Sequence, residues 1–419
     1  MAEFREILKN KNFLFLWLGQ ITSQFGDRLN QMALIALIYA RAPGSALQLA
    51  KLLSFTIIPV FVVGPVAAAY VDRWDRRRIM IVCDALRAVL VALVAFFFLG
   101  AKNLWPIYTA LFLIFSVSRF FIPAKMAIIP ELVSKEKLLL ANSLSSTSGM
   151  IAVVAGLGAG GLIVEAVGAR GGLVIDMLTY LFSGFMVFMI TSRAHTYLRK
   201  ERPIEALRDA ERLFKKTLFS EIKEGWHYLI GDSDVRFIAQ SFFLLGSAAG
   251  AVFVVAIIFV QRAFGSVTQD LGILAVFLGL GLFVNSLIYG RLGAKLSRIK
   301  AIFIFLGASG VVLSVFTISL KFFPSMFLAV ILIFLLGMAL APIIISSYTL
   351  IHEITKQKMY GRIFGSLEVV AHLGFLLFMF LTSFLAERIG RFQILLFVGI
   401  ALAVIGWGAL ALKLDKRRI

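Results

Sequence analysis

The residues best suited to chemistry interrupt the first apolar stretch of the chain. They recur every three or four positions, which places them on one face of a helix. This polar stripe comprises Gln20, Ser23, Gln24, Asp27, Asn30 and Gln31. Asp27 lies about midway along the stretch, where a carboxyl group could take up and release a proton. Asp27 is therefore a candidate proton carrier, with Arg28, Asn30 and Gln31 beside it. The alternative is a buried ion pair with Arg28 or Arg119 that only fixes helix packing.

A second candidate pair lies in a later apolar stretch. Glu368 and His372 are four residues apart and so share a helical face. They could titrate as a unit and contribute to proton coupling or to substrate contact, or they could form a packing hydrogen bond. Two ligands without a third make a metal site unconvincing, and the single cysteine, Cys83, excludes a cysteine-based cluster. We expect neither a metal nor another cofactor.

The composition is that of a membrane protein. The chain has 419 residues, of which 60% are hydrophobic and 16% charged, and its mean hydropathy is +0.94. Its net charge of +19 does not indicate nucleic-acid binding, because the basic residues lie between apolar runs. Twelve such runs are long enough for membrane helices. They cover roughly residues 13–40, 46–71, 79–100, 105–129, 138–168, 171–192, 236–261, 270–289, 301–320, 325–347, 361–385 and 392–412. The sequence predicts an all-α membrane protein.

The distribution of basic residues predicts the topology. Most of the 42 Lys and Arg residues fall in segments on the side that would hold both termini. Short basic segments stay in the cytoplasm, so both ends are expected there. The longest hydrophilic segment follows the sixth run and divides the chain into an N-terminal half (1–192), a cytoplasmic linker (193–235) and a C-terminal half (236–419). We expect the linker to form a helix on the membrane face.

A charged hairpin loop separates the second and third apolar runs. It contains Asp72, Arg73, Arg76 and Arg77, and the third run adds Asp84 and Arg87 one turn apart. We expect these groups to form a latch between the halves on the cytoplasmic side. The latch would hold while the cavity opens outward and break when it opens inward. The alternative is that the arginines only determine topology.

The two halves also carry a weak internal repeat. Glu131 follows the fourth run and Glu353 follows the tenth, each in a similar short motif. Such repeats are typical of transporters built from two related halves.

Four segments together resemble the major facilitator superfamily. They are FGDRLNQMAL at 25–34, DRWDRRRIMIVCDALRA at 72–88, FFIPAKMAIIPELVSKEKLLLANSL at 120–144 and GLGAGG at 156–161. The closest resemblance is to bacterial siderophore and drug exporters, with lysophospholipid transporters as relatives. Ala68 replaces a glycine of the loop signature. Gly156, Gly160 and Gly161 match an antiporter motif in which Leu157 replaces proline. Arg119 resembles the arginine that the superfamily places near the proton path.

The resemblance implies twelve helices in two pseudo-symmetric halves of six that work by alternating access. It implies a monomer in the bacterial inner membrane that exports an amphipathic or apolar small molecule as protons enter. Its partners would be that substrate, protons and membrane lipids, and not nucleic acid. The alternative is a transporter that moves lysophospholipid between leaflets. The chain has neither an HExxH motif nor a phosphate-binding glycine loop, so we expect no enzyme and no ATP drive.

The topology can be tested with accessibility tags. Tags at both termini and within 200–220 should report the cytoplasm, and a tag beside Lys102 should report the outside. A C-terminal tag found outside would overturn the twelve-span arrangement.

Overall fold

The computed structural model describes residues 7–64, 67, 71, 74–191, 233–293, 296–354 and 360–412. Within these ranges the regular structure is entirely helical, as a lipid environment requires, because a helix satisfies its backbone polar groups internally. Nine helices of the described residues are long and apolar enough to cross a membrane. The prediction of a multi-pass helical membrane protein is confirmed.

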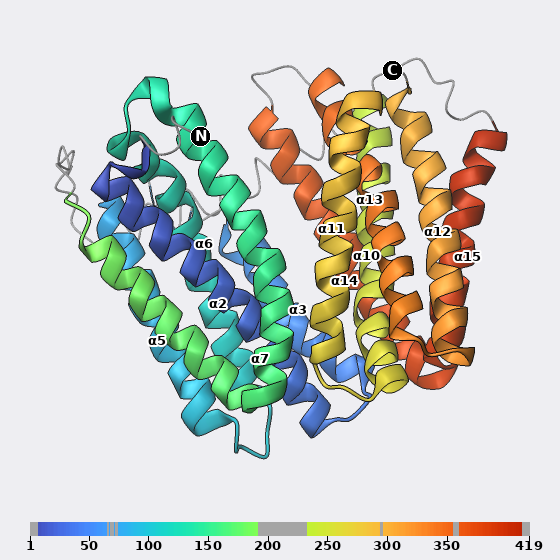
Figure 1. Ribbon diagram of the computed structural model, residues 1–419, viewed down its shortest axis with the longest axis horizontal. Helices are drawn as coiled ribbons and strands as arrows, with labels where there is room; N and C mark the ends of the chain where they lie inside the picture. Colours follow the sequence, from blue (N-terminus) through green and yellow to red (C-terminus); the bar gives the residue numbers. More distant parts are fainter. Residues whose placement is uncertain are drawn as a thin grey trace. The chain divides into compact units, whose positions relative to one another are not determined.

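The helices follow the predicted apolar runs along the chain (Figure 1). The earlier elements are α2 (Lys11–Arg41), α3 (Ala46–Val62), α5 (Arg76–Leu93), the π-helical turn η1 (Val94–Phe98), α6 (Trp105–Leu132), the 3-10 turn η2 (Lys135–Lys137) and α7 (Leu138–Phe188). The later elements are α10 (Ser233–Phe264), α11 (Gln269–Leu292), α12 (Arg298–Phe322), α13 (Met326–Ile354), α14 (Tyr360–Arg388) and α15 (Arg391–Ala411).

Helix α7 contains two of the predicted runs because it reverses direction at Gly168. This glycine has φ 73° and ψ 175°, a conformation that is costly for residues with a Cβ atom. We call residues 138–167 the first arm of α7 and residues 169–188 the second arm. Both arms can therefore contact the same neighbouring helix.

The described residues divide into two compact units. The first comprises those of Met1–Arg41 and Leu52–Leu218, and the second those of Ala42–Lys51 and Phe219–Ile419. The sequence did not indicate that residues 42–51 group with the second unit. Most of the predicted linker, 193–235, lies outside the described residues.

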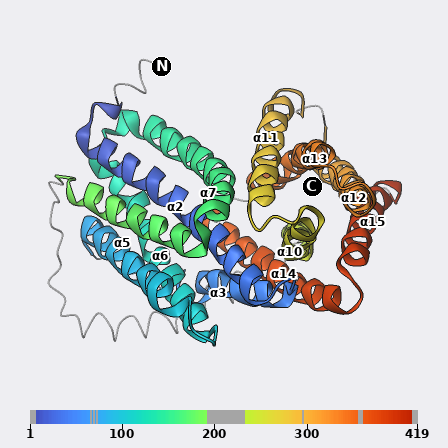
Figure 2. The ribbon, with the colours of Figure 1, turned by 60° about the horizontal axis from the view of Figure 1, so that its bottom comes forward.

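In the first unit, α2 lies along α7, and α5 packs on both α6 and α7 (Figures 1 and 2). In the second unit the main helix pairs are α10 with α14, α11 with α13 and α12 with α15. Glycine permits the close contacts in this unit. A Cβ atom at Gly246 would lie 2.1 Å from the Ala371 carbonyl oxygen, and one at Gly281 would lie 2.1 Å from that of Phe334. Small residues allow membrane helices to approach in this way.

The predicted repeat appears as a matching ion pair in each unit. Arg76 begins α5 and pairs with Glu131 at the end of α6. Arg298 begins α12 and pairs with Glu353 near the end of α13, with Nε and Oε1 3.4 Å apart. The equivalence of Glu131 and Glu353 is thus confirmed by their contacts.

The start of α3 is held by a carboxylate of the second unit. Glu387 of α14 accepts hydrogen bonds from the Ser45 hydroxyl, at 2.7 Å, and from the Leu47 amide, at 3.0 Å. Arg391 donates to the carbonyl oxygen of Gly44. The first amides of a helix have no partner within the helix, so Glu387 satisfies one of them from outside. These contacts explain why residues 42–51 group with the second unit.

Replacing Glu387 should show how much this contact contributes. Glu387→Ala should lower the stability of the folded protein by about 1 kcal/mol, as the loss of a helix cap does. Glu387→Gln keeps an oxygen acceptor and should lose less. Thermal unfolding of the purified protein measures both variants, and equal melting temperatures for Glu387→Ala and the parent protein would contradict this assignment.

Candidate functional site

Asp27 and Asn30 of the polar stripe face the second arm of α7, whereas Gln24 lies against Gly149 of the first arm. Asp27 is half-buried, and its Oδ1 accepts a hydrogen bond of 2.5 Å from the hydroxyl of Tyr180. Tyr180 is itself only 2% exposed. The hydrogen-bond partner of Asp27 is therefore a neutral donor on a distant helix, and neither Arg28 nor Arg119 takes that place.

A second carboxyl group lies one turn away on the same two helices. Asp176 is fully buried, and its Oδ2 accepts a hydrogen bond of 2.6 Å from the Asn30 side chain. Gly26 makes room for this contact. A Cβ atom on Gly26 would lie 2.6 Å from Asp176 Oδ1 and 1.9 Å from the Thr179 hydroxyl oxygen. The glycine of the predicted FGDRLNQMAL segment thus lets α2 approach Asp176 closely.

Helix α5 contributes a buried cation to the same region. Arg87 is 3% exposed and forms an ion pair with Asp84, which is fully buried. Its guanidinium carbon also lies 4.3 Å from the ring centroid of Phe121 and 4.4 Å from that of Tyr180. Contacts with aromatic faces stabilise a cation that has left water. Tyr180 thereby contacts Arg87 with its ring and Asp27 with its hydroxyl.

These groups form one buried network inside the first unit. We define it as Asp27, Asn30, Asp84, Arg87, Asp176 and Tyr180. It sets three carboxyl groups against one guanidinium. Ionised groups in apolar surroundings require compensation, so the network cannot hold all its possible charges equally well.

Arg28 points to a different neighbour from Asp27. Its Nη1 donates a 3.0 Å hydrogen bond to Gln31 Oε1, and its Cβ would be 2.9 Å from a Cβ atom at Gly156. Gly160 lies next to the α2 backbone at Leu29 in the same way. Gly156 and Gly160 of the predicted antiporter-like motif therefore line the contact between α2 and the first arm of α7, and Gly161 is buried.

The arginines of the predicted cytoplasmic loop contact the ends of neighbouring helices. Besides its ion pair with Glu131, Arg76 donates to the Ala127 carbonyl oxygen at 3.2 Å. Arg77 donates to the carbonyl oxygens of Val187, at 3.2 Å, and Phe188, where α7 ends. Cationic side chains are favourable at a helix C-terminus.

The other four residues of the predicted latch are Asp72, Arg73, Asp84 and Arg87. Asp72 and Arg73 lie outside the described residues. Asp84 and Arg87 were expected in the cytoplasmic latch, which stays a prediction; the ion pair and ring contacts that the structure gives them lie within the first unit. Their burial assigns them to the network around Tyr180.

The contact between Glu368 and His372 does not involve the carboxylate. His372 Nδ1 lies 2.8 Å from the backbone carbonyl oxygen of Glu368, and the Glu368 side chain is exposed. This is a hydrogen bond within α14. Among the described residues, no group of three or more His, Cys, Asp or Glu side chains could hold a metal ion.

Sequence reasoning missed Tyr180 and gave Asp176 no role. Both lie on the second arm of α7, in a polar stripe with Thr179 and Ser183. Their helical spacing was visible in the sequence. The contact between that stripe and α2, however, depends on the reversal of the chain at Gly168.

Comparisons with known proteins agree with this architecture. A family model described as transmembrane secretion effector, MFS_3, matches residues 6–414. The chain is 25% identical to the uncharacterized MFS-type transporter YkuC of Bacillus subtilis over 86% of this chain and 82% of that protein. It is 23% identical to macrolide efflux protein A of Streptococcus pyogenes over 90% of each.

Solved structures share the fold. A bacterial homologue of the iron transporter ferroportin, in an inward-facing state, matches with a TM-score of 0.72 and 14% identity over 96% of this chain and 98% of that one. A mutant of the nucleoside transporter NupG matches with a TM-score of 0.67 and 13% identity over 97% of this chain and 99% of that one.

The ion pair in the buried network should be sensitive to the loss of one partner. Arg87→Met leaves Asp84 buried without its cation and should destabilise the protein by about 3 to 5 kcal/mol. Adding Asp84→Asn removes the uncompensated charge and should recover part of that loss. Thermal unfolding in detergent compares the variants.

Arg78→Met supplies a matched control for this experiment. Arg78 lies on the same helix, but its side chain is 80% exposed. Its loss should leave the melting temperature nearly unchanged. A double variant less stable than Arg87→Met alone would contradict the compensation of Arg87 by Asp84.

Proposed function

The chain belongs to the major facilitator superfamily of secondary transporters, and from this premise we propose that it is a proton-coupled exporter of an amphipathic or apolar small molecule. In this proposal, twelve membrane helices form two six-helix halves in the bacterial inner membrane, with both termini in the cytoplasm. The halves expose one central site alternately to each side.

The observation that carries the proposal is the hydrogen bond from Tyr180 to Asp27 inside the buried network. Intramembrane ionisable groups are costly and are retained where they serve transport. Asp27 combines partial exposure with a neutral donor, so it can exchange a proton without first breaking an ion pair. Tyr180 lies on α7, and its ring contacts Arg87 of α5. A change in the protonation of Asp27 can therefore change the positions of these two helices.

The direction and the substrate rest on similarity and on composition. Macrolide efflux protein A is an exporter by its name, and it matches nine-tenths of this chain. The described spans contain few charged side chains, which suits a substrate that carries little charge. Export against a gradient then requires a driving ion, and the buried carboxyl groups suit the proton.

Replacing Asp27 tests the coupling. Asp27→Asn keeps the shape of the side chain and removes its titration. Proteoliposomes under an imposed pH gradient should then lose accumulation of substrate, while exchange driven by the substrate gradient remains detectable. A screen of dyes, siderophores and lysophospholipids supplies the transported compound and separates export of a solute from movement of a lipid.

Two further variants make this result specific. Tyr180→Phe removes only the hydroxyl and should shift the pH dependence of transport while leaving substrate binding intact. Glu165→Gln changes an exposed carboxyl on α7 and should behave as the parent protein. If Asp27→Asn still accumulates substrate with the parent pH dependence, the coupling role of Asp27 is refuted.

A further inference from the structure

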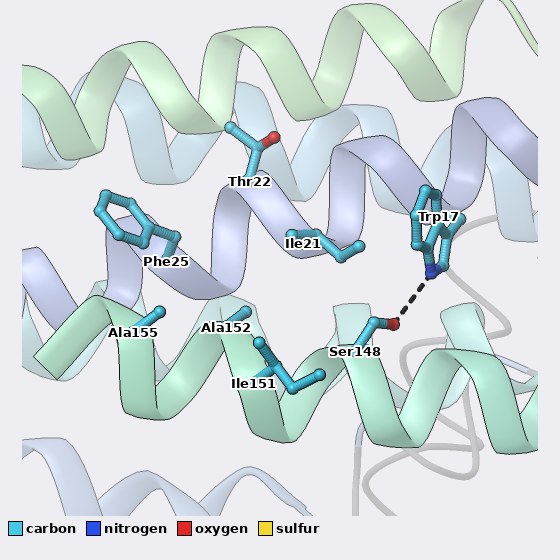
Figure 3. A pocket seen from close by; sticks show the side chains of 8 residues that line it. All are labelled: Trp17, Ile21, Thr22, Phe25, Ser148, Ile151, Ala152 and Ala155. Atoms are coloured by element: carbon cyan, nitrogen blue, oxygen red, sulfur yellow. Dashed lines mark hydrogen bonds between the residues drawn. The ribbon is translucent and has the colours of Figure 1, made fainter. Parts of the chain in front are cut away.

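A cavity of about 540 Å³ lies between α2 and the first arm of α7 (Figure 3). Four residues of α2 and four of the first arm of α7 line it, among them Trp17, Phe25 and Ile151. Its volume lies in the range of sites that bind small molecules. The whole cavity lies within the first unit.

The walls of this cavity offer apolar surface. The indole Nε1 of Trp17 donates a 2.9 Å hydrogen bond to the Ser148 hydroxyl, as Figure 3 shows. The Thr22 hydroxyl donates to the Leu18 carbonyl oxygen of its own helix, at 2.9 Å. The polar side chains of the wall are therefore engaged with the protein. The surface that the cavity offers is therefore mainly apolar, which favours an apolar occupant.

Arg28 lies one helical turn beyond Phe25 on the same face of α2. On the facing arm, Gly156 directly follows Ala155, which lines the cavity. The Cβ atom of Arg28 is 2.9 Å from the place of a Cβ at Gly156, so glycine admits the arginine between the helices. Arg28 does not itself line the cavity, but it follows the last lining residue along this face of α2.

Arg28 has unused hydrogen-bonding capacity. In the part of the chain that the structure describes, its side chain makes one hydrogen bond, from Nη1 to Gln31, and no ion pair. Its Nε is buried and has no acceptor. This contrasts with Arg87, which has Asp84 and two aromatic rings. A guanidinium within a membrane helix normally pairs with an acid or a carbonyl oxygen, and its planar donors match a carboxylate or phosphate.

We propose that this cavity is a binding subsite for a single-chain anionic amphiphile. Its alkyl chain lies against Trp17, Phe25 and Ile151, and its anionic group accepts hydrogen bonds from Arg28. The inference rests on the proposed function, because it takes the amphiphile to be the transported substrate and places it between α2 and α7. A substrate with one negative charge gives Arg28 the acidic partner that it lacks among the described residues.

Equilibrium binding to the protein in lipid nanodiscs tests the subsite without any proton gradient. The probes are radiolabelled laurate, a twelve-carbon lysophosphatidylglycerol and, as the cation of equal chain length, dodecyltrimethylammonium. One or both anions should bind saturably, and the cation should not displace them. Arg28→Gln should weaken anion binding about 10- to 100-fold, as loss of a charged hydrogen bond does, whereas Arg28→Lys should retain most of it.

A matched pair of variants tests the apolar part. Ala155→Trp fills the cavity from an exposed position and should abolish anion binding. Met150→Trp adds the same bulk at a residue that is 70% exposed and does not line the cavity, so binding should persist. Monodisperse elution of each variant confirms that it is folded.

Three results would overturn the subsite: neither anion binds saturably, Arg28→Gln binds as the parent protein does, or Ala155→Trp leaves the affinity unchanged. Failure here and failure of the proposed function are distinguishable. Without anion binding, proton-driven export of another compound by the parent protein refutes only the subsite. With binding intact, accumulation that is unaffected by Asp27→Asn refutes only the coupling role.

Discussion

The buried guanidinium of Arg87 is the constraint on which the first unit depends. Arginine keeps its charge in proteins, so the fold must surround it with compensating groups. Asp84 supplies the opposite charge from the same helix, and the rings of Phe121 and Tyr180 supply faces from α6 and α7. The contact with Arg87 fixes the Tyr180 ring, and the ring in turn places a hydroxyl against Asp27 of α2. One buried cation therefore sets the relative positions of four helices and orients the candidate proton carrier.

The reversal of α7 at Gly168 gives adjacent residues of α2 different neighbours. Asp27 contacts the second arm through Tyr180, whereas Arg28 lies against the first arm at Gly156. Consecutive residues of a helix are about 100° apart around its axis, which suits a helix flanked by two arms. This separation explains why the acid and the base at 27 and 28 do not neutralise each other. The Asp27 carboxyl group and the Arg28 guanidinium each remain available for another partner.

The sequence predicted features that depend on local patterns, and the structure added those that depend on packing. Helical spacing located the apolar runs and the polar stripe of α2, and the similar motifs around Glu131 and Glu353 indicated an internal repeat. The partners of Asp27 and Arg87 could not be predicted in this way. Tyr180 lies 153 positions from Asp27, and no periodicity indicates which faces of two distant helices meet. The grouping of residues 42–51 with the second unit likewise depends on Glu387, far along the chain.

The carboxyl groups of the buried network have two types of partner. Asp84 is bound to a cation, whereas Asp27 and Asp176 are bound to the neutral donors Tyr180 and Asn30. An ion pair loses its attraction when the acid is protonated, but a hydroxyl can turn from donor to acceptor and an amide can still donate to the remaining oxygen. Protonation of Asp27 or Asp176 therefore changes the charge near Arg87 while their hydrogen bonds persist. Of these two acids, Asp27 is the one that is partly exposed, so it is the member of the network best placed to meet water.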